Sequence, residues 1–361
     1  MHRDPAAPNG DPIKRAETFA SSCIAEHWSG SGLESVEELR GDASSRAYLR
    51  LHLSAENPKA PATLIAMILA DAAVALSSEE LSVFGDGGPT ELPFLNVARF
   101  LAKVTDALPR IEAISPDESV ILLEDVGDTT LWDAASSSLD PEVEFRRALD
   151  WLAKVQHDAT DDGSGCYAFE QSFDERLFRW EFEHFLEYGV SRAAPESLVT
   201  AAKAELDAAA RALADLPQVF CHRDYHAWNL HIAEGRLRVI DYQDALMGPA
   251  LYDVASLLTD RATPTLITAA REESLVDYFA GLVGADNDRE GVHRAYRLCA
   301  LQRTLKVVGR FNYLADVKGK PQYREMLADV VPTARRHLAA GENLSATTEL
   351  FDAWVRGVAG A

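Results

Sequence analysis

The sequence predicts an α+β fold of two lobes, in which a small mixed sheet precedes a larger helical lobe. Arg46 to Leu53 alternates polar and apolar residues, and Thr63 to Leu69 is continuously apolar, so both segments are expected to be strands. From Pro141 onward the apolar residues recur with the helical period. The chain has 361 residues, which exceeds the usual size of a single core. We therefore expect residues 1–126 to form the first lobe and residues 127–361 the second.

Composition limits the partners of this chain. It is 47% apolar and 25% charged, and 57 Asp and Glu residues against 35 Lys and Arg give a net charge of -22. Such acidity disfavours nucleic acid and anionic membranes as partners. Solubility alone would also explain the negative charge. The four cysteines show no C-x-x-C spacing, which argues against a zinc site or a disulfide framework. Without a signal peptide or a membrane-spanning run, we expect a cytoplasmic protein.

The first lobe is expected to begin with a helix from about Lys14 to Trp28 and a strand from Ser35 to Arg40. Small residues, Gly41 to Ser45, separate that strand from the next. Such a turn lets backbone N–H groups approach phosphates, so Ser44 and Ser45 are candidate nucleotide contacts. A tight hairpin would use the same small residues, and both interpretations stay open.

The end of the first lobe carries a second nucleotide signal. Leu92 to Leu108 has the helical period, and Ser119 to Glu124 is expected to be a strand that ends in an acidic, glycine-containing turn. Backbone N–H and C=O groups of such a turn can contact the edge of a nucleotide base, and apolar neighbours can lie against the ring. Leu122, Glu124 and Val126 are therefore candidate nucleotide contacts, with Leu122 beside the ring. A simple linker after an edge strand is the alternative.

The most informative segment runs from His222 to Asn229 and reads His-Arg-Asp-Tyr-His-Ala-Trp-Asn. Phosphoryl transfer needs a carboxylate that accepts a proton from the attacking hydroxyl, and oxygen ligands that hold magnesium on the phosphates. Asp224 fits the first role. Asn229 has the H-R-D-x-x-x-x-N spacing, and Asp241 ends an apolar strand, so these two fit the second. The pattern indicates a nucleotide with Mg²⁺ on its phosphates as cofactors.

Context separates this motif from chance. His2 to Asn9 matches the same string, but it has no strand before it, contains two prolines and lacks a following strand that ends in Asp. The copy at His222 follows the apolar Val219 to Cys221 and precedes Leu237 to Ile240. An ordinary strand-loop-strand hairpin with surface polar residues remains the alternative.

With these residues the chain resembles the aminoglycoside phosphotransferase and choline kinase-like family, from Gly41 to about Asp352. The similarity is most specific at His222 to Asn229 and at Ile240 to Asp253. The resemblance implies a protein-kinase-like bilobal fold and ATP-dependent phosphorylation of an alcohol acceptor.

Four stretches together are similar to the bacterial anomeric kinases of N-acetylmuramate and N-acetylglucosamine. They are residues 41–48, 122–129, 239–245 and 302–309. This resemblance implies an amino sugar as substrate, a sugar 1-phosphate as product and a role in peptidoglycan recycling. An aminoglycoside, choline or homoserine as acceptor, or a silent pseudokinase that regulates a partner, stays open as an alternative.

One departure from the family pattern concerns the phosphate-binding lysine. The strand Thr63 to Leu69 contains no lysine, and Met67 or its neighbour takes that position. The helix expected from Leu92 to Leu108 likewise contains no glutamate to pair with such a lysine. We hypothesise that Arg46 or Arg50, on the polar face of the preceding strand, supplies the cation. Both arginines could instead be solvated.

The candidate contacts to the acceptor lie near the catalytic carboxylates in the sequence. His226, Gln243 and Asp244 each lie within three residues of one, so they are candidate sugar contacts, and Asp174 and Glu175 are further polar candidates. Arg303, Lys306 and Arg310 share one face of a predicted helix.

An anionic sugar would require a cation, and Arg303 is the candidate; a solvated helix face is the alternative. Support for the loop is expected from His222 and from Asp253, which lies at the start of a helix. There Asp253 could accept backbone N–H groups of the catalytic loop, or it could simply cap the helix.

Overall fold

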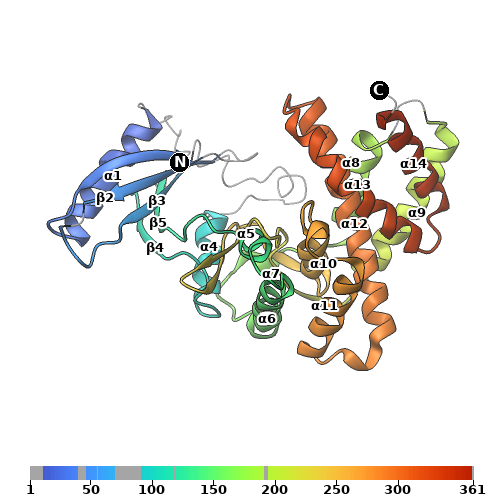
Figure 1. Ribbon diagram of the computed structural model, residues 1–361, viewed down its shortest axis with the longest axis horizontal. Helices are drawn as coiled ribbons and strands as arrows, with labels where there is room; N and C mark the ends of the chain where they lie inside the picture. Colours follow the sequence, from blue (N-terminus) through green and yellow to red (C-terminus); the bar gives the residue numbers. More distant parts are fainter. Residues whose placement is uncertain are drawn as a thin grey trace, which may run out of the picture. The chain divides into compact units, whose positions relative to one another are not determined.

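The computed structural model describes residues 11–39, 46–54, 56–69, 91–117, 119–190 and 194–359 (Figure 1). Ser44 and Ser45 lie outside the described residues. The chain divides into two compact units, one from Met1–Asn96 and Ala107–Gly127, the other from Val97–Asp106 and Asp128–Ala361. Residues 97–106, which the sequence assigned to the first lobe, cluster with the second unit.

The first unit contains a five-stranded antiparallel sheet with the strand order β1-β2-β3-β5-β4. The bounds are α1 Pro12–His27, β1 Leu33–Leu39, β2 Arg46–Leu53, β3 Thr63–Leu69, β4 Ile111–Ile114 and β5 Val120–Glu124. The short strand β4 was not foreseen, because its half-buried residues have no clear alternation. Its pairing partner β5 stabilises it through Ile111, Ala113 and Ile114.

Helix α1 covers one face of this sheet. Asp11 caps the helix by accepting the Ile13 N–H, and Pro12 occupies the first turn, where its missing donor costs nothing. Side chains alternate across a strand, so β2 directs Leu49, Leu51 and Leu53 into the core beneath α1. The same core includes Leu64, Ala66 and Ile68 of β3 and Val120 and Leu122 of β5.

The second unit is mostly helical. Its elements outside the strands are α5 Leu131–Ser136, α6 Glu142–Asp158, α7 Tyr167–Glu170, α8 Glu175–Tyr188, α9 Glu196–Ala214, α10 Tyr252–Thr259, α11 Ala269–Leu282, α12 Arg289–Asp316, α13 Gln322–Ala340 and α14 Ser345–Ala359, with 3₁₀ turns at Thr263–Thr265 and Asp286–Asp288. The long helix α12 packs against α8, α10 and α13, and α9 packs against α8 and α14 (Figure 1). The antiparallel sheet of the first unit and the helices of the second confirm the α+β class.

Two short antiparallel pairs frame the motif at His222. β6 (Gln218–Cys221) pairs with β9 (Leu246–Pro249), and β7 (Leu230–Ala233) pairs with β8 (Arg236–Val239). The strand before the motif and the strand before Asp241 thus have different partners. The alternative of an ordinary hairpin around the motif is wrong.

Helix α4 spans Pro93–Leu101 and ends earlier than the pattern to Leu108 suggested. Tertiary contacts explain the difference. The carbonyl oxygen of Val104 accepts a bond from Lys154 at 2.9 Å, and the hydroxyl of Thr105 accepts one from the Trp151 indole at 2.9 Å. Lys154 of α6 thus hydrogen-bonds a carbonyl group that a longer helix would have paired with one of its own N–H groups.

Among the described residues, no helix combines the length and the apolar character that crossing a membrane requires.

Candidate active site

The catalytic loop, residues 222–229, is held by the carboxylate of Asp253. One oxygen accepts the His222 N–H at 2.6 Å and the other accepts the Arg223 N–H at 2.9 Å. Asp253 is fully buried in the first turn of α10. Burial raises the pKa of Asp253 to about 7, although the two N–H groups act in the opposite direction. Both oxygens bond to the loop, so a plain capping role does not describe this residue.

Asp224 lies at the centre of the loop and faces a buried arginine. Arg303 of α12 donates to its Oδ1 at 3.2 Å, and the side chains are 35% exposed for Asp224 and 9% for Arg303. Burial would raise the pKa of Asp224, but the charges of Arg303 and then Lys306 outweigh it and hold the pKa well below its usual range. Asp224 is therefore ionised, positioned and still accessible.

A second carboxylate joins three elements below the loop. Glu181 of α8 is completely buried and contacts Arg223 at 3.3 Å, Lys306 at 2.6 Å and Gln302 at 2.5 Å. Two of these partners belong to α12 and one to the catalytic loop. The solvated-face alternative is therefore wrong for Arg303 and Lys306, which are largely buried and pair with Asp224 and Glu181.

Sequence reasoning missed Glu181, although a signal for it existed. On α8 the residues Leu177, Phe178, Phe182 and Phe185 form the buried face, and Glu181 lies among them at helical spacing. An acid on an apolar helix face requires a buried cation partner. Nothing in the linear pattern identified those partners as Arg223 and Lys306.

The candidate metal ligands lie together at the other end of the loop. The Asn229 amide nitrogen donates to the Asp224 carbonyl at 2.9 Å and lies 3.4 Å from Asp241 Oδ2. Asn229 and Asp241 thus lie within contact distance of each other, and each carries a side-chain oxygen. Gln243 donates to Asp241 Oδ1 at 2.8 Å and to Asp244 at 3.1 Å.

This pair fits a magnesium ion that shares its coordination shell with phosphates and water. Mg²⁺ takes oxygen ligands and in such sites needs only one or two from the protein. In the part of the chain that the structure describes, no group of three or more His, Cys, Asp or Glu side chains could hold a metal. Asn229 and Asp241 therefore suit an ion that arrives with a nucleotide.

Two site residues have an unusual backbone conformation. Arg223 has φ 76° and Asp241 has φ 64°, in the left-handed region that non-glycine residues rarely adopt. Such conformations cost about 1–3 kcal/mol each and persist where surrounding contacts impose them. Here Glu181, Asp253 and Gln243 are those contacts.

The two histidines of the motif differ in their surroundings. His222 Nε2 lies 3.0 Å from the Ile240 carbonyl, so this nitrogen carries the proton. Burial lowers the pKa of His222, which keeps the ring neutral. It therefore links the loop to the strand end before Asp241. Two polar side-chain atoms near the motif, Nδ1 of His226 and Oε1 of Gln243, are buried and have no hydrogen-bond partner in the described structure.

In the first unit the two candidate phosphate cations, Arg46 and Arg50, both lie on β2. Arg46 is opposite Leu69, and Tyr48 is opposite Met67, the position that lacks lysine. Arg50 forms an ion pair with Asp125, with its Nε 2.7 Å from the carboxylate, and both side chains are largely buried. The solvated alternative is therefore wrong for Arg50, whose charge is already paired.

The candidate nucleotide contacts from Leu122 to Val126 are more buried than expected. Leu122 is 0% exposed and packs beneath α1, so its side chain cannot lie against an adenine ring. Glu124 contacts Arg110 at 3.2 Å, and its N–H donates to the Arg110 carbonyl. Val126 is 9% exposed. The proposed ring contact through the Leu122 side chain is thus corrected, because alternation along β5 directs it into the core.

Asp174 and Glu175 have structural partners. Asp174 caps α8 by accepting the Leu177 N–H at 2.8 Å. Glu175 contacts Arg179 at 2.5 Å and Arg211 at 3.7 Å. These contacts account for both acids as the start of a helix and its surface pairs.

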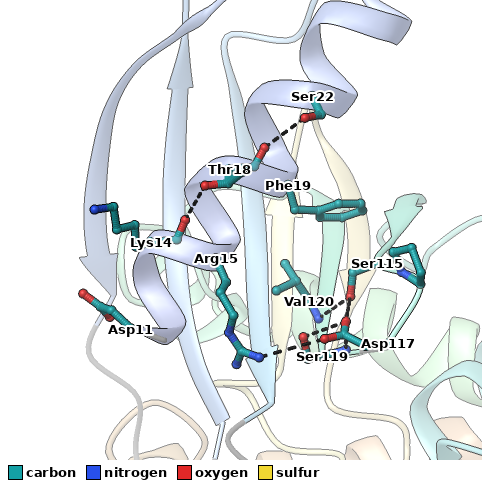
Figure 2. A pocket seen from close by; sticks show the side chains of 11 residues that line it. Asp11, Lys14, Arg15, Thr18, Phe19, Ser22, Ser115, Asp117, Ser119 and Val120 are labelled. Atoms are coloured by element: carbon teal, nitrogen blue, oxygen red, sulfur yellow. Dashed lines mark hydrogen bonds and ion pairs between the residues drawn. The ribbon is translucent and has the colours of Figure 1, made fainter. Parts of the chain in front are cut away.

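A separate cavity of about 530 Å³ lies in the first unit, between α1 and the turn from β4 to β5 (Figure 2). Arg15 points into it and approaches Asp117 at 3.9 Å. Bonds from Ser115 and Ser119 lower the pKa of Asp117, although burial opposes them. None of the predicted site residues lines this cavity.

The family follows from comparison with known proteins. The model of the phosphotransferase enzyme family matches residues 35–293, which is more than half of the chain. This protein belongs to that family, whose members include the aminoglycoside phosphotransferases. The family assignment predicted from the motifs is confirmed.

Named relatives agree with this class. The N-acetylmuramate/N-acetylglucosamine kinase of Pseudomonas putida is 33% identical over 239 residues, covering 64% of this chain and 68% of the relative. The enzyme of the same name from Caulobacter vibrioides is 28% identical over 321 residues, covering 82% and 84%. Among solved structures, the ethanolamine kinase of Plasmodium vivax has a TM-score of 0.59 at 10% identity and covers 90% of both chains, which supports the fold alone.

Removal of the Glu181 charge should destabilise the second unit. In Glu181→Gln, Arg223 and Lys306 stay buried without a counter-charge, and breaking such a pair costs about 3–5 kcal/mol. Urea unfolding monitored by circular dichroism measures the loss. Glu183→Gln is the matched control on the same helix, because Glu183 is 55% exposed and contacts only Lys203 among the described residues. Equal losses in the two variants would contradict the central role of Glu181.

Proposed function

We propose that this protein uses ATP to phosphorylate the anomeric hydroxyl of N-acetylmuramate or N-acetylglucosamine, and releases the sugar 1-phosphate. The observation that carries the proposal is the joint arrangement of Asp224, Asn229 and Asp241 on one loop and the following strand end. The names of the relatives support an amino sugar as acceptor. Its place would then be peptidoglycan recycling in the cytoplasm.

Asp224 would orient the attacking hydroxyl and accept its proton. The charge of Arg303 favours the ionised form, so Asp224 is a weak base. An anomeric hydroxyl is more acidic than an ordinary alcohol and suits such a base. Positioning and electrostatic stabilisation would then supply most of the rate. This match favours an anomeric hydroxyl over an ordinary alcohol such as that of choline.

Asn229 and Asp241 would hold the magnesium of the nucleotide. When bound, Mg²⁺ supplies positive charge that stabilises the transferring phosphoryl group. Gln243 orients Asp241 through the 2.8 Å bond to its Oδ1. His226 and Asp244 remain proposed sugar contacts, because each lies within three residues of a catalytic carboxylate.

Residues of the first unit are further proposed nucleotide contacts. We propose that Ser44 and Ser45 approach the phosphates, and that backbone groups of residues 122–126 contact adenine. Arg46 or Arg50 is the proposed replacement for the missing lysine, and Arg50 also contacts Asp125. Arg303 is proposed to act on Asp224 rather than to contact the sugar.

The first test is a phosphorylation screen with ATP and magnesium, with products detected by mass spectrometry. N-acetylmuramate and N-acetylglucosamine should be phosphorylated with loss of the reducing end. Asp224→Asn should lower turnover by at least about 100-fold with nucleotide binding retained. Asp215→Asn, at an exposed position after α9, is the control. Transfer only to an aminoglycoside, choline or homoserine would reject the sugar assignment, and no transfer to any acceptor would indicate a pseudokinase.

The pH profile tests the role of Arg303. Its charge lowers the pKa of Asp224, so the acid limb of kcat/KM should lie below the range usual for an aspartate. In Arg303→Gln this pKa rises, and the acid limb should move to higher pH. Arg303→Lys should keep most of the original profile because it keeps the charge. An unmoved limb in Arg303→Gln would mean that Arg303 does not act through Asp224.

Arg46 is tested through the nucleotide. Arg46→Ala should raise the KM for ATP by about tenfold or more, the value of one hydrogen bond between charged groups, and leave the KM for the sugar unchanged. Steady-state kinetics at saturating sugar measures this effect. Lys59→Ala, exposed between β2 and β3, is the control. A rise of the KM for ATP in Arg50→Ala alone, with unchanged stability, would identify Arg50 as the cation.

A further inference from the structure

Arg261 lies beside the catalytic loop, immediately after helix α10. Its guanidinium group is over the ring of Trp228 at 5.0 Å from the centroid. Trp228 directly precedes Asn229 and is four residues from Asp224. Arg261 is only partly buried, so a ligand can reach it. The Arg261 guanidinium group therefore contacts the catalytic loop, although the sequence patterns assigned no function to Arg261.

The charge of Arg261 has no acidic partner among the described residues. Its only hydrogen bond there goes to the sulfur of Met326 at 3.4 Å, which is a weak acceptor. The other basic residues at the loop are committed: Arg303 to Asp224, and both Arg223 and Lys306 to Glu181. In so acidic a chain, a half-buried arginine without a carboxylate is available to an anionic ligand.

Trp228 fixes the position of this arginine. Its indole stacks on Trp132 of α5 with centroids 5.4 Å apart and planes 18° apart. Both indoles are partly buried, and their Nε1 atoms have no hydrogen-bond partner in the described part of the chain. A cation over an indole loses freedom before it binds anything, which lowers the entropic cost of recognition. Trp132, Trp228 and Arg261 thus form a preorganised column beside the loop.

Arg261 follows an acid whose charge acts on Arg303. Burial of Arg303 would lower its pKa, but the charges of Tyr252, Asp224 and Asp260 outweigh burial and raise it. Arg261 is the next residue. The hydroxyl to be phosphorylated must approach Asp224, whereas the phosphates must approach Asn229 and Asp241. An acceptor anion is the ligand assigned to Arg261, and the nucleotide is the alternative that the KM for ATP tests.

We propose that Arg261 binds the carboxylate of an anionic acceptor sugar and thereby determines a preference for that sugar over its neutral counterpart. This inference rests on the proposed function, because it assigns the acceptor of the same site. N-acetylmuramate carries a lactyl carboxylate, and N-acetylglucosamine carries none. Arg261 takes the role that sequence patterns suggested for Arg303, whose charge is occupied by Asp224.

The test compares both sugars in wild type, Arg261→Gln and Arg261→Lys. In Arg261→Gln, kcat/KM for N-acetylmuramate should fall about 10- to 100-fold relative to N-acetylglucosamine, the range of a hydrogen bond to a charged group. Arg261→Lys should recover part of the preference. The matched control is Arg146→Gln, which removes an arginine over the ring of Tyr278 on other helices. An unchanged ratio of the two sugars in Arg261→Gln would overturn the proposal.

The nucleotide is the other possible anion, and the KM for ATP separates the two. With N-acetylglucosamine as acceptor, Arg261→Gln should leave the KM for ATP unchanged. A higher KM for ATP with both sugars affected equally would assign Arg261 to the phosphates and overturn the proposal.

Binding keeps the two proposals distinguishable. If wild type phosphorylates neither sugar, the proposed function fails, and calorimetry of N-acetylmuramate against N-acetylglucosamine still tests Arg261. Tighter binding of N-acetylmuramate that is lost in Arg261→Gln supports the inference, and equal binding of the two sugars overturns it.

Discussion

The arrangement of the site depends on the ion pairs and the hydrogen bond that the Glu181 carboxylate forms. This carboxylate is fully buried and joins α8 to the catalytic loop through Arg223 and to α12 through Gln302 and Lys306. A buried ion pair contributes little net stability compared with apolar packing, because desolvation offsets the attraction. Its effect is to allow one arrangement, since a shift of α12 would leave charges unpaired. In that arrangement Arg303, next to Gln302, meets Asp224.

Asp253 also constrains the position of the loop. Its two oxygens hold consecutive backbone N–H groups of the loop, and Arg223 adopts the left-handed conformation between them. The loop is therefore held through its backbone by Asp253 and through a side chain by Glu181. Asp224 and Asn229 are therefore positioned before any ligand arrives. This preorganisation is what transfer of a phosphoryl group requires from a protein that makes no covalent bond to it.

Local patterns were sufficient for many elements. Strands β2 and β3 have the expected bounds, because alternation in one and continuous burial in the other are properties of neighbouring residues. Strand β4 and the pairing of β6 with β9 were not predictable, since each depends on a partner elsewhere in the chain. Likewise, the helical period correctly placed Arg303 and Lys306 on one face. It could not show that these two residues are largely buried, because their acidic partners, Asp224 and Glu181, lie on other segments.

The sequence by itself determined the family of this protein, through a loop with the spacing of a phosphotransferase and an aspartate after an apolar strand, and it also showed the absence of the usual lysine. Spacing along one short segment is a local property, so it survives without knowledge of the fold. Only the tertiary structure decided which charges are already paired. Arg50 belongs to Asp125, Arg303 belongs to Asp224, and Arg261 has Trp228 but no acid among the described residues. Ion pairing depends on distances between segments that lie far apart in the chain, and no pattern of neighbouring residues encodes those distances.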